Sequence, residues 1–137
     1  MAMFEPAKVI EYQDGEDPKE AVLSALGNAL DGITLFQNDI LLVTAPVMSK
    51  TKGGIIRVDQ TITEERFQGK IGLIVALGET AFNDEDRWPN EDTIPVVGDW
   101  VFYRTADTNE CKINGMSCRF IKDTMVKGKA TTPDAIR

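Results

Sequence analysis

The chain has 137 residues, of which 42% are hydrophobic, and it carries a formal net charge of -7 at pH 7. This length and composition fit one domain with a modest core. The acidic balance argues against a general nucleic-acid binder, because phosphate contacts need clustered lysine and arginine. The sequence contains no histidine, which removes the commonest general base and the commonest metal ligand.

The sequence also argues against a membrane protein and an enzyme. No stretch is apolar for long enough to span a bilayer, and the first residues lack a basic start followed by an apolar core. We therefore expect a cytoplasmic protein. No Ser or Cys stands in a recognisable nucleophile motif, and two cysteines without histidine cannot complete a zinc site in one chain. We expect no catalysis, no cofactor and no metal.

A helix start stands out near the N-terminus. Asp17 begins the sequence DPKE, which combines an N-cap, a proline at the first helical position and a glutamate where a capping box has one. Apolar residues follow at helical spacing, and Gly32 offers a stop. These signals predict a helix over about 18–31, within an N-terminal extension over 1–32.

From Ile33 onward the sequence is typical of β-structure. Short apolar runs bounded by turn residues predict strands at 40–43, 69–77 and 100–104. Many short strands with a single convincing helix indicate a small, mostly antiparallel β-barrel over 33–129. We interpret 130–137 as a solvated tail.

An Asn-Gly pair at Asn114 predicts a β-hairpin. Extended runs flank it on both sides, and a two-residue turn of this kind needs positive φ at both positions. Counting outward from the turn pairs Cys111 with Cys118. In a reducing cytoplasm we expect free thiols there instead of a disulfide. Exposed strand edges in so small a core make oligomerisation a reasonable expectation.

The polar segment over 49–65 is longer than a hairpin loop usually is. It carries two glycines, Gly53 and Gly54, followed by the isoleucines Ile55 and Ile56. Long loops inside compact domains are uncommon and tend to be functional or disordered. The isoleucines either fold back onto the barrel or are held ready for a partner.

The order of these features resembles the GroES-type co-chaperonins, the lids of the chaperonin folding chamber. The resemblance runs from about residue 35 to about residue 128. It is carried by the first strand at 37–43, the glycine-glycine-aliphatic loop motif at 51–56, the following strand at 69–78, the valine-glycine-aspartate turn at 97–101 and the last hairpin at 120–126.

The resemblance implies a mainly β protein: a GroES-like antiparallel β-barrel with a contact loop over 49–65, an acidic roof-like turn over 83–92 and a helix-bearing extension. It implies a homo-oligomer, heptameric as in the family, that binds a GroEL-type chaperonin ring without covalent chemistry. Arg57 stands where the family usually has a third aliphatic residue, and Val58 follows it. The implied partner-binding residues are Gly53, Gly54, Ile55, Ile56, Arg57 and Val58.

The added segments suit phage-encoded relatives of this family. The extension and the tail have no counterpart in the short bacterial proteins. The resemblance therefore implies a lid that assists folding of a phage capsid protein in the host cytoplasm. The alternative is a virion structural protein, a capsid decoration or another head or tail component, whose partners are capsid proteins.

Overall fold

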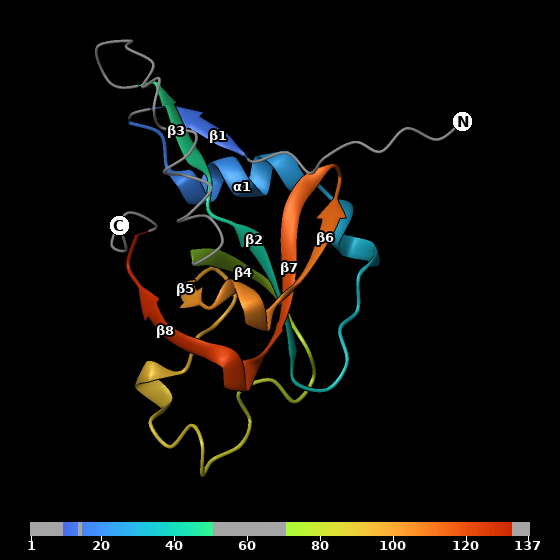
Figure 1. Ribbon diagram of the computed structural model, residues 1–137, viewed down its shortest axis with the longest axis vertical. Coiled ribbons are helices and arrows are strands. Elements are labelled where there is room, and N and C mark those ends of the chain that lie inside the picture. Colours follow the sequence, from blue (N-terminus) through green and yellow to red (C-terminus); the bar gives the residue numbers. More distant parts are fainter. Residues whose placement is uncertain (1–9, 14, 51–70, 133–137) are drawn as a thin grey trace.

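The computed structural model describes residues 10–13, 15–50 and 71–132 (Figure 1). Over these ranges the chain is mainly β, with one α-helix, and no helix is long and apolar enough to cross a membrane. The elements in chain order are β1 (Glu11–Gln13), α1 (Pro18–Leu26), β2 (Asp39–Thr44), β3 (Val47–Lys50), β4 (Ile71–Leu77), β5 (Trp100–Tyr103), β6 (Asn109–Ile113), β7 (Met116–Lys122) and β8 (Val126–Ala130).

The strands of the described ranges form two sheets. The larger has the order β6-β7-β2-β4-β5-β8, and every neighbouring pair in it is antiparallel. This arrangement is consistent with the small GroES-like β-barrel expected from the sequence. The smaller sheet is a parallel pair of β1 and β3, which the sequence did not predict.

Strand β2 is buried on both faces of the larger sheet. Ile40, Leu41, Leu42 and Val43 are all fully buried. Because successive side chains of a strand point to opposite faces, they feed two separate apolar clusters. The helix-side cluster contains Ile10, Val22, Leu26, Leu41, Val43, Ala45, Ile71, Leu73, Val75, Trp100 and Cys118. The turn-side cluster contains Ile40, Leu42, Ile74, Ala81, Phe82, Val101, Tyr103, Ile121 and Val126.

Helix α1 begins where the sequence predicted and ends earlier. The Asp17 side chain accepts a hydrogen bond from the backbone N–H of Lys19 at 2.9 Å, and Pro18 is the first helical residue. The helix stops at Leu26 because Gly27 adopts a positive φ of 57° and its N–H bonds back to Leu23. The predicted end near residue 31 is therefore wrong, and a separate 3₁₀ turn covers Ala29–Gly32.

The predicted β6–β7 hairpin is confirmed in position and register. Asn114 and Gly115 have φ of 53° and 80°, as the two-residue turn requires. Ile113 pairs with Met116, and Cys111 pairs with Cys118. Local turn chemistry alone therefore fixed which residues of these strands face each other.

The central position of β2 leads to a stability prediction. Replacing Leu42, which is fully buried, by Ala should lower the free energy of unfolding by about 2–5 kcal/mol, because transfer and cavity terms add. The same substitution at Leu23, which is 45% exposed on α1, should change it by about 0.5 kcal/mol or less. Urea denaturation measures both. Equal losses for the two variants would contradict the placement of β2 at the centre.

Candidate functional site

The predicted contact loop falls largely outside the described residues. The structure does describe where the chain leaves the larger sheet and where it returns. The backbone N–H of Ala45 donates to the carbonyl oxygen of Ile71 at 3.2 Å, so residues 46–70 begin and end at neighbouring positions between β2 and β4. We call Ala45, β3 and Ile71 the loop stem. The predicted binding residues that lie outside the described ranges are Gly53, Gly54, Ile55, Ile56, Arg57 and Val58.

The residues of the loop stem lie in a closely packed part of the structure. Ala45 and Ile71 are both buried in the helix-side cluster. Next to Ile71, a Cβ atom on Gly72 would lie 2.8 Å from the carbonyl oxygen of Val43, so only glycine fits there without a shift. Thr44 and Ser117 share a buried hydrogen bond of 2.8 Å between their hydroxyl groups. The departure point of the loop is therefore fixed by contacts on several sides.

The first part of the segment beyond Ala45 pairs with the N-terminal extension. Strand β3 pairs in parallel with β1, with Glu11 opposite Val47, Tyr12 opposite Met48 and Gln13 opposite Lys50. Tyr12 is buried, and Glu11 and Gln13 are exposed. Figure 1 shows the β1–β3 pair beside α1, at one end of the long axis.

Helix α1 holds the extension against the larger sheet at several points. Val22 and Leu26 belong to the helix-side cluster. The side-chain amide of Asn114, at the β6–β7 turn, donates to the carbonyl oxygen of Ala25 at 3.0 Å. Lys19 lines a cleft of about 330 Å³ with Asp99 and Lys129, which lie 3.8 Å apart. The extension thus touches both the hairpin and the β5–β8 side of the sheet.

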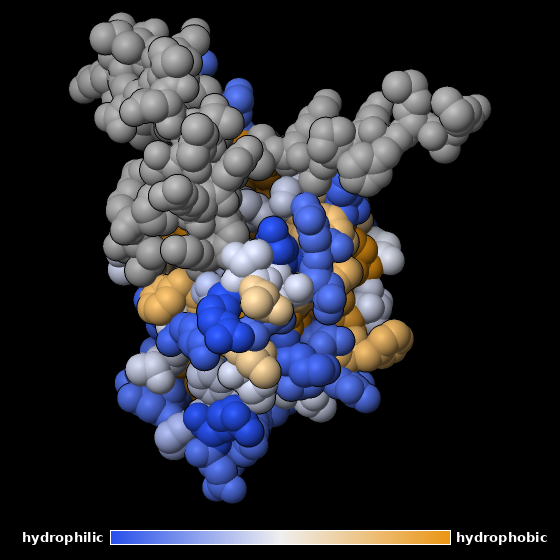
Figure 2. Space-filling view, viewed as in Figure 1, coloured by the Kyte–Doolittle hydropathy of each residue, from blue (hydrophilic) through white to orange (hydrophobic). Residues whose placement is uncertain are grey.

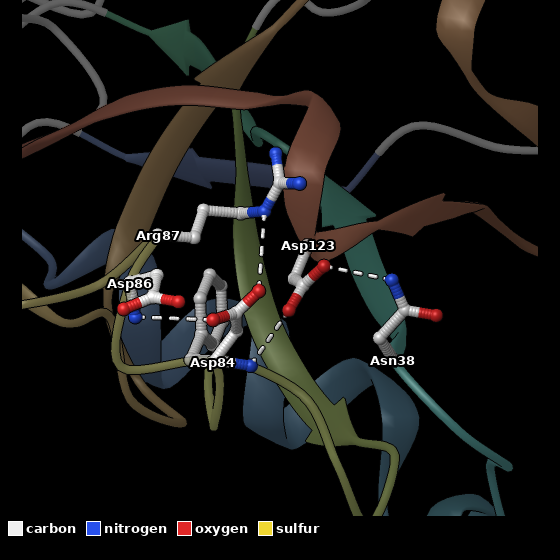
Figure 3. Close-up of polar contacts among 6 residues, drawn as sticks. Asn38, Asp84, Asp86, Arg87 and Asp123 are labelled. Atoms are coloured by element: carbon white, nitrogen blue, oxygen red, sulfur yellow. Dashed lines mark hydrogen bonds and ion pairs between the residues drawn. The ribbon is translucent and has the colours of Figure 1, made fainter.

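The acidic segment after β4 lies at the opposite end of the molecule (Figure 1), where hydrophilic residues gather in Figure 2. A buried carboxylate fastens it. Asp123 accepts one hydrogen bond from the side-chain amide of Asn38 and one from the backbone N–H of Phe82, each 2.8 Å long (Figure 3). The backbone N–H of Asp123 donates to the Asn38 carbonyl at 3.0 Å. We call these contacts the Asp123 clasp.

Within the acidic segment, the carboxylate of Asp84 makes its contacts inside the turn itself. Asp84 accepts from the backbone N–H of Asp86 at 3.0 Å and lies 3.9 Å from the exposed guanidinium of Arg87. The rings of Phe82 and Trp88 meet edge to face, with centroids 4.8 Å apart. Among the residues that the structure describes, no group of three or more acidic or cysteine side chains could hold a metal ion. These contacts of Asp84 and Trp88 lie within the segment itself and stabilise its turn.

The cysteine pair is poorly suited to nucleophilic chemistry. Cys111 and Cys118 are cross-strand neighbours with free thiols. Burial, and secondarily the neighbouring Cys111, raises the pKa of Cys118 to about 12. Burial also raises the pKa of Cys111, and the charge of Glu110 acts in the same direction. Because the thiolate is the reactive form, both thiols are held in their unreactive state at neutral pH.

Comparison with known families decides the class of this protein. A family model for the chaperonin 10 kDa subunit matches residues 32–130. The chain belongs to the chaperonin 10 kDa subunit family. No curated protein matches the sequence significantly. Membership supports a co-chaperonin-type function and implies an interaction with a GroEL-type chaperonin and oligomerisation.

The family match separates the structure of this co-chaperonin into two parts. It spans β2 to β8, including both sides of the loop stem and the acidic segment. It leaves out β1 and α1, which pack on that stem. Sequence reasoning found the loop by its glycines and isoleucines but missed two supports, the β1–β3 pairing and the Asp123 clasp. Both join residues far apart in the chain, so no local pattern could have revealed them.

The Asp123 clasp can be tested by a nearly isosteric change. Asp123→Asn replaces one acceptor oxygen by a donor that faces the donor on Asn38 or Phe82, so we expect a loss of about 1–3 kcal/mol in the free energy of unfolding. Hydrogen exchange at the Phe82 amide should accelerate. The matched control Asp86→Asn changes an exposed carboxylate and should leave both quantities unchanged. A protected Phe82 amide in Asp123→Asn would contradict the clasp.

Two buried groups predict the response to alkaline pH. Burial raises the pKa of Cys118 from 9.0 and of Tyr103 from 10.0, each to about 12. Between about pH 9 and pH 12 the folded chain therefore keeps protons that the unfolded chain has released. The free energy of unfolding has its full value below about pH 9 and falls as the pH rises toward 12. Urea denaturation across this window measures the decline. Tyr103→Phe and Cys118→Ala should each make it shallower, and an unchanged slope in both would refute the assignment.

Proposed function

We propose that this chain is a co-chaperonin lid: an oligomeric ring, heptameric as in the family, that closes a GroEL-type chaperonin through the segment 49–65. The family match over residues 32–130 carries this proposal. The geometry supports it, because residues 46–70 leave and rejoin the sheet at neighbouring positions, Ala45 and Ile71. A loop whose two ends are held at neighbouring positions of the sheet can bind a partner without disturbing the barrel.

The contact residues in this proposal are Ile55 and Ile56. Gly53 and Gly54 precede them and permit backbone conformations that other residues avoid. Each loop loses conformational entropy when it docks, so a single contact is weak and reversible. Several loops presented by one ring act together and raise the overall affinity. Arg57 takes the position of a third aliphatic residue, and Val58 supplies the next apolar side chain.

The strand order supports ring formation. In the described part of the chain, β6 and β8 are the outer strands of the larger sheet. Outer strands carry backbone groups that need a covering segment or a neighbouring subunit. A ring supplies such neighbours at every position. We therefore include subunit contacts through the sheet edges in the proposal.

The proposed client is a phage capsid protein, folded in the host cytoplasm. The N-terminal extension, which lies outside the family match, agrees with the added segments expected of phage-encoded relatives. A virion component built on the same barrel would instead be present in purified particles at fixed copy number. Composition of purified particles separates these two roles.

Binding assays test the proposed contact residues. The unsubstituted ring should form a nucleotide-dependent complex with a GroEL-type chaperonin, and Ile55→Ser or Ile56→Ser should weaken it by about tenfold or more, because each lesion repeats in every subunit. Leu23→Ser removes an exposed aliphatic side chain on α1 and serves as the control with unchanged binding. Isothermal titration measures the affinities. Absence of a nucleotide-dependent complex for the unsubstituted protein would reject the function, and wild-type affinity in both isoleucine variants would reject the residues.

A further inference from the structure

The N-terminal extension is joined to the core of the family domain even though the family match begins after it. Ile10, Val22 and Leu26 are 6%, 0% and 1% exposed. They share the helix-side cluster with Leu41 of β2 and Ile71 of β4. The extension therefore packs as part of the domain and does not behave as a loose tail.

The extension reaches both arms of the loop stem. On the outgoing arm, β1 pairs with β3, the strand that directly follows β2 across Pro46. On the returning arm, Ile71 lies in the same cluster as Ile10 and Leu26. One added segment thus pairs with the chain where it departs for the loop and shares an apolar cluster with the residue where it comes back.

The β1–β3 pair depends on that packing. An isolated two-stranded sheet is only marginally stable in water. This one is parallel, and its register shifts between Tyr12 and Gln13. Ile10, which directly precedes β1, and Tyr12, in the middle of β1, are buried, and α1 contacts the strand. Burial of these side chains stabilises β1 in its position beside β3.

We propose that residues 10–31 position the contact loop of this co-chaperonin, with Tyr12 as the positioning residue. In this role Tyr12 acts within the subunit and does not itself touch the chaperonin. It keeps β1 on β3, so the outgoing arm is ordered as far as Lys50 before any chaperonin binds. Ordering residues on binding costs conformational entropy, and residues already ordered by the extension do not add to that cost. This inference rests on the proposed chaperonin-binding function.

The effect is multiplied by the ring. A small gain for each loop is repeated at every subunit, so the extension acts on the sum of many weak contacts. A co-chaperonin whose loops are positioned in this way needs less affinity for the chaperonin from the tip of each loop. This matters here because the loop motif carries Arg57 where a third aliphatic residue is usual.

The test uses the full-length ring and compares Tyr12→Ala with Glu11→Ala, an exposed neighbour on the same strand. In Tyr12→Ala we expect faster hydrogen exchange at the amides of Val47, Met48 and Lys50, the β3 residues that pair with β1, and roughly tenfold weaker binding to a GroEL-type chaperonin. Glu11→Ala should leave exchange and binding as in the unsubstituted ring. Wild-type exchange at these amides in Tyr12→Ala would overturn the proposal.

A second variant separates positioning from a general loss of stability. Val101→Ala removes volume from the turn-side cluster, which contains no described residue of the extension. At a temperature where all variants are fully folded, it should bind the chaperonin as the unsubstituted ring does, although it unfolds at lower urea. Equal weakening in Val101→Ala and Tyr12→Ala would overturn the positioning role.

Failure of this inference can be distinguished from failure of the proposed function. Hydrogen exchange at Val47, Met48 and Lys50 reports on the β1–β3 pairing with no chaperonin present. If the unsubstituted ring binds no chaperonin, the proposed function fails while the exchange result still stands. If the unsubstituted ring binds and Tyr12→Ala binds equally well, the positioning inference alone fails.

Discussion

The burial of β2 on both faces is the constraint on which the rest of this structure depends. A sheet whose central strand is apolar on both sides needs an apolar cover on each side. The N-terminal extension covers one face through Val22 and Leu26, and the segment after β4 covers the other through Ala81 and Phe82. The extension and the segment after β4 therefore both supply apolar cover that β2 requires.

The two ends of β2 are also the points to which the loop stem and the acidic segment are attached. At its C-terminal end, Ala45 bonds to Ile71 and sets the departure point of the loop. Just before its N-terminal end, Asn38 joins the Asp123 clasp, and Asp39 accepts a hydrogen bond from Gly78. The loop stem and the acidic segment are thus fastened to opposite ends of one buried strand.

The sequence predicted the features whose causes are local. The side chain of Asp17 caps the start of a helix, and Asn114 favours the positive φ of a hairpin turn, so both elements could be predicted from a few neighbouring residues. The predicted helix end was wrong because the chain already takes a positive φ at Gly27, five residues before the predicted stop at Gly32. The β1–β3 pairing and the Asp123 clasp join distant segments and carry no periodic pattern. The residues of the loop motif, from Gly53 to Val58, stay a prediction carried by the family resemblance.

The boundary of the family match is not a boundary of folding. Val22 and Leu26 are almost fully buried in the same cluster as side chains of β2 and β4, and burying each such side chain contributes about 1.5–3 kcal/mol. Removing the extension would take these side chains out of the cluster to which Leu41 and Val43 belong. Because the net stability of a domain is only about 5–15 kcal/mol, a barrel cut at residue 32 would lose a large share of it. The described part of the extension therefore belongs to the fold, and Ala45 and Ile71 of the loop stem share its apolar cluster.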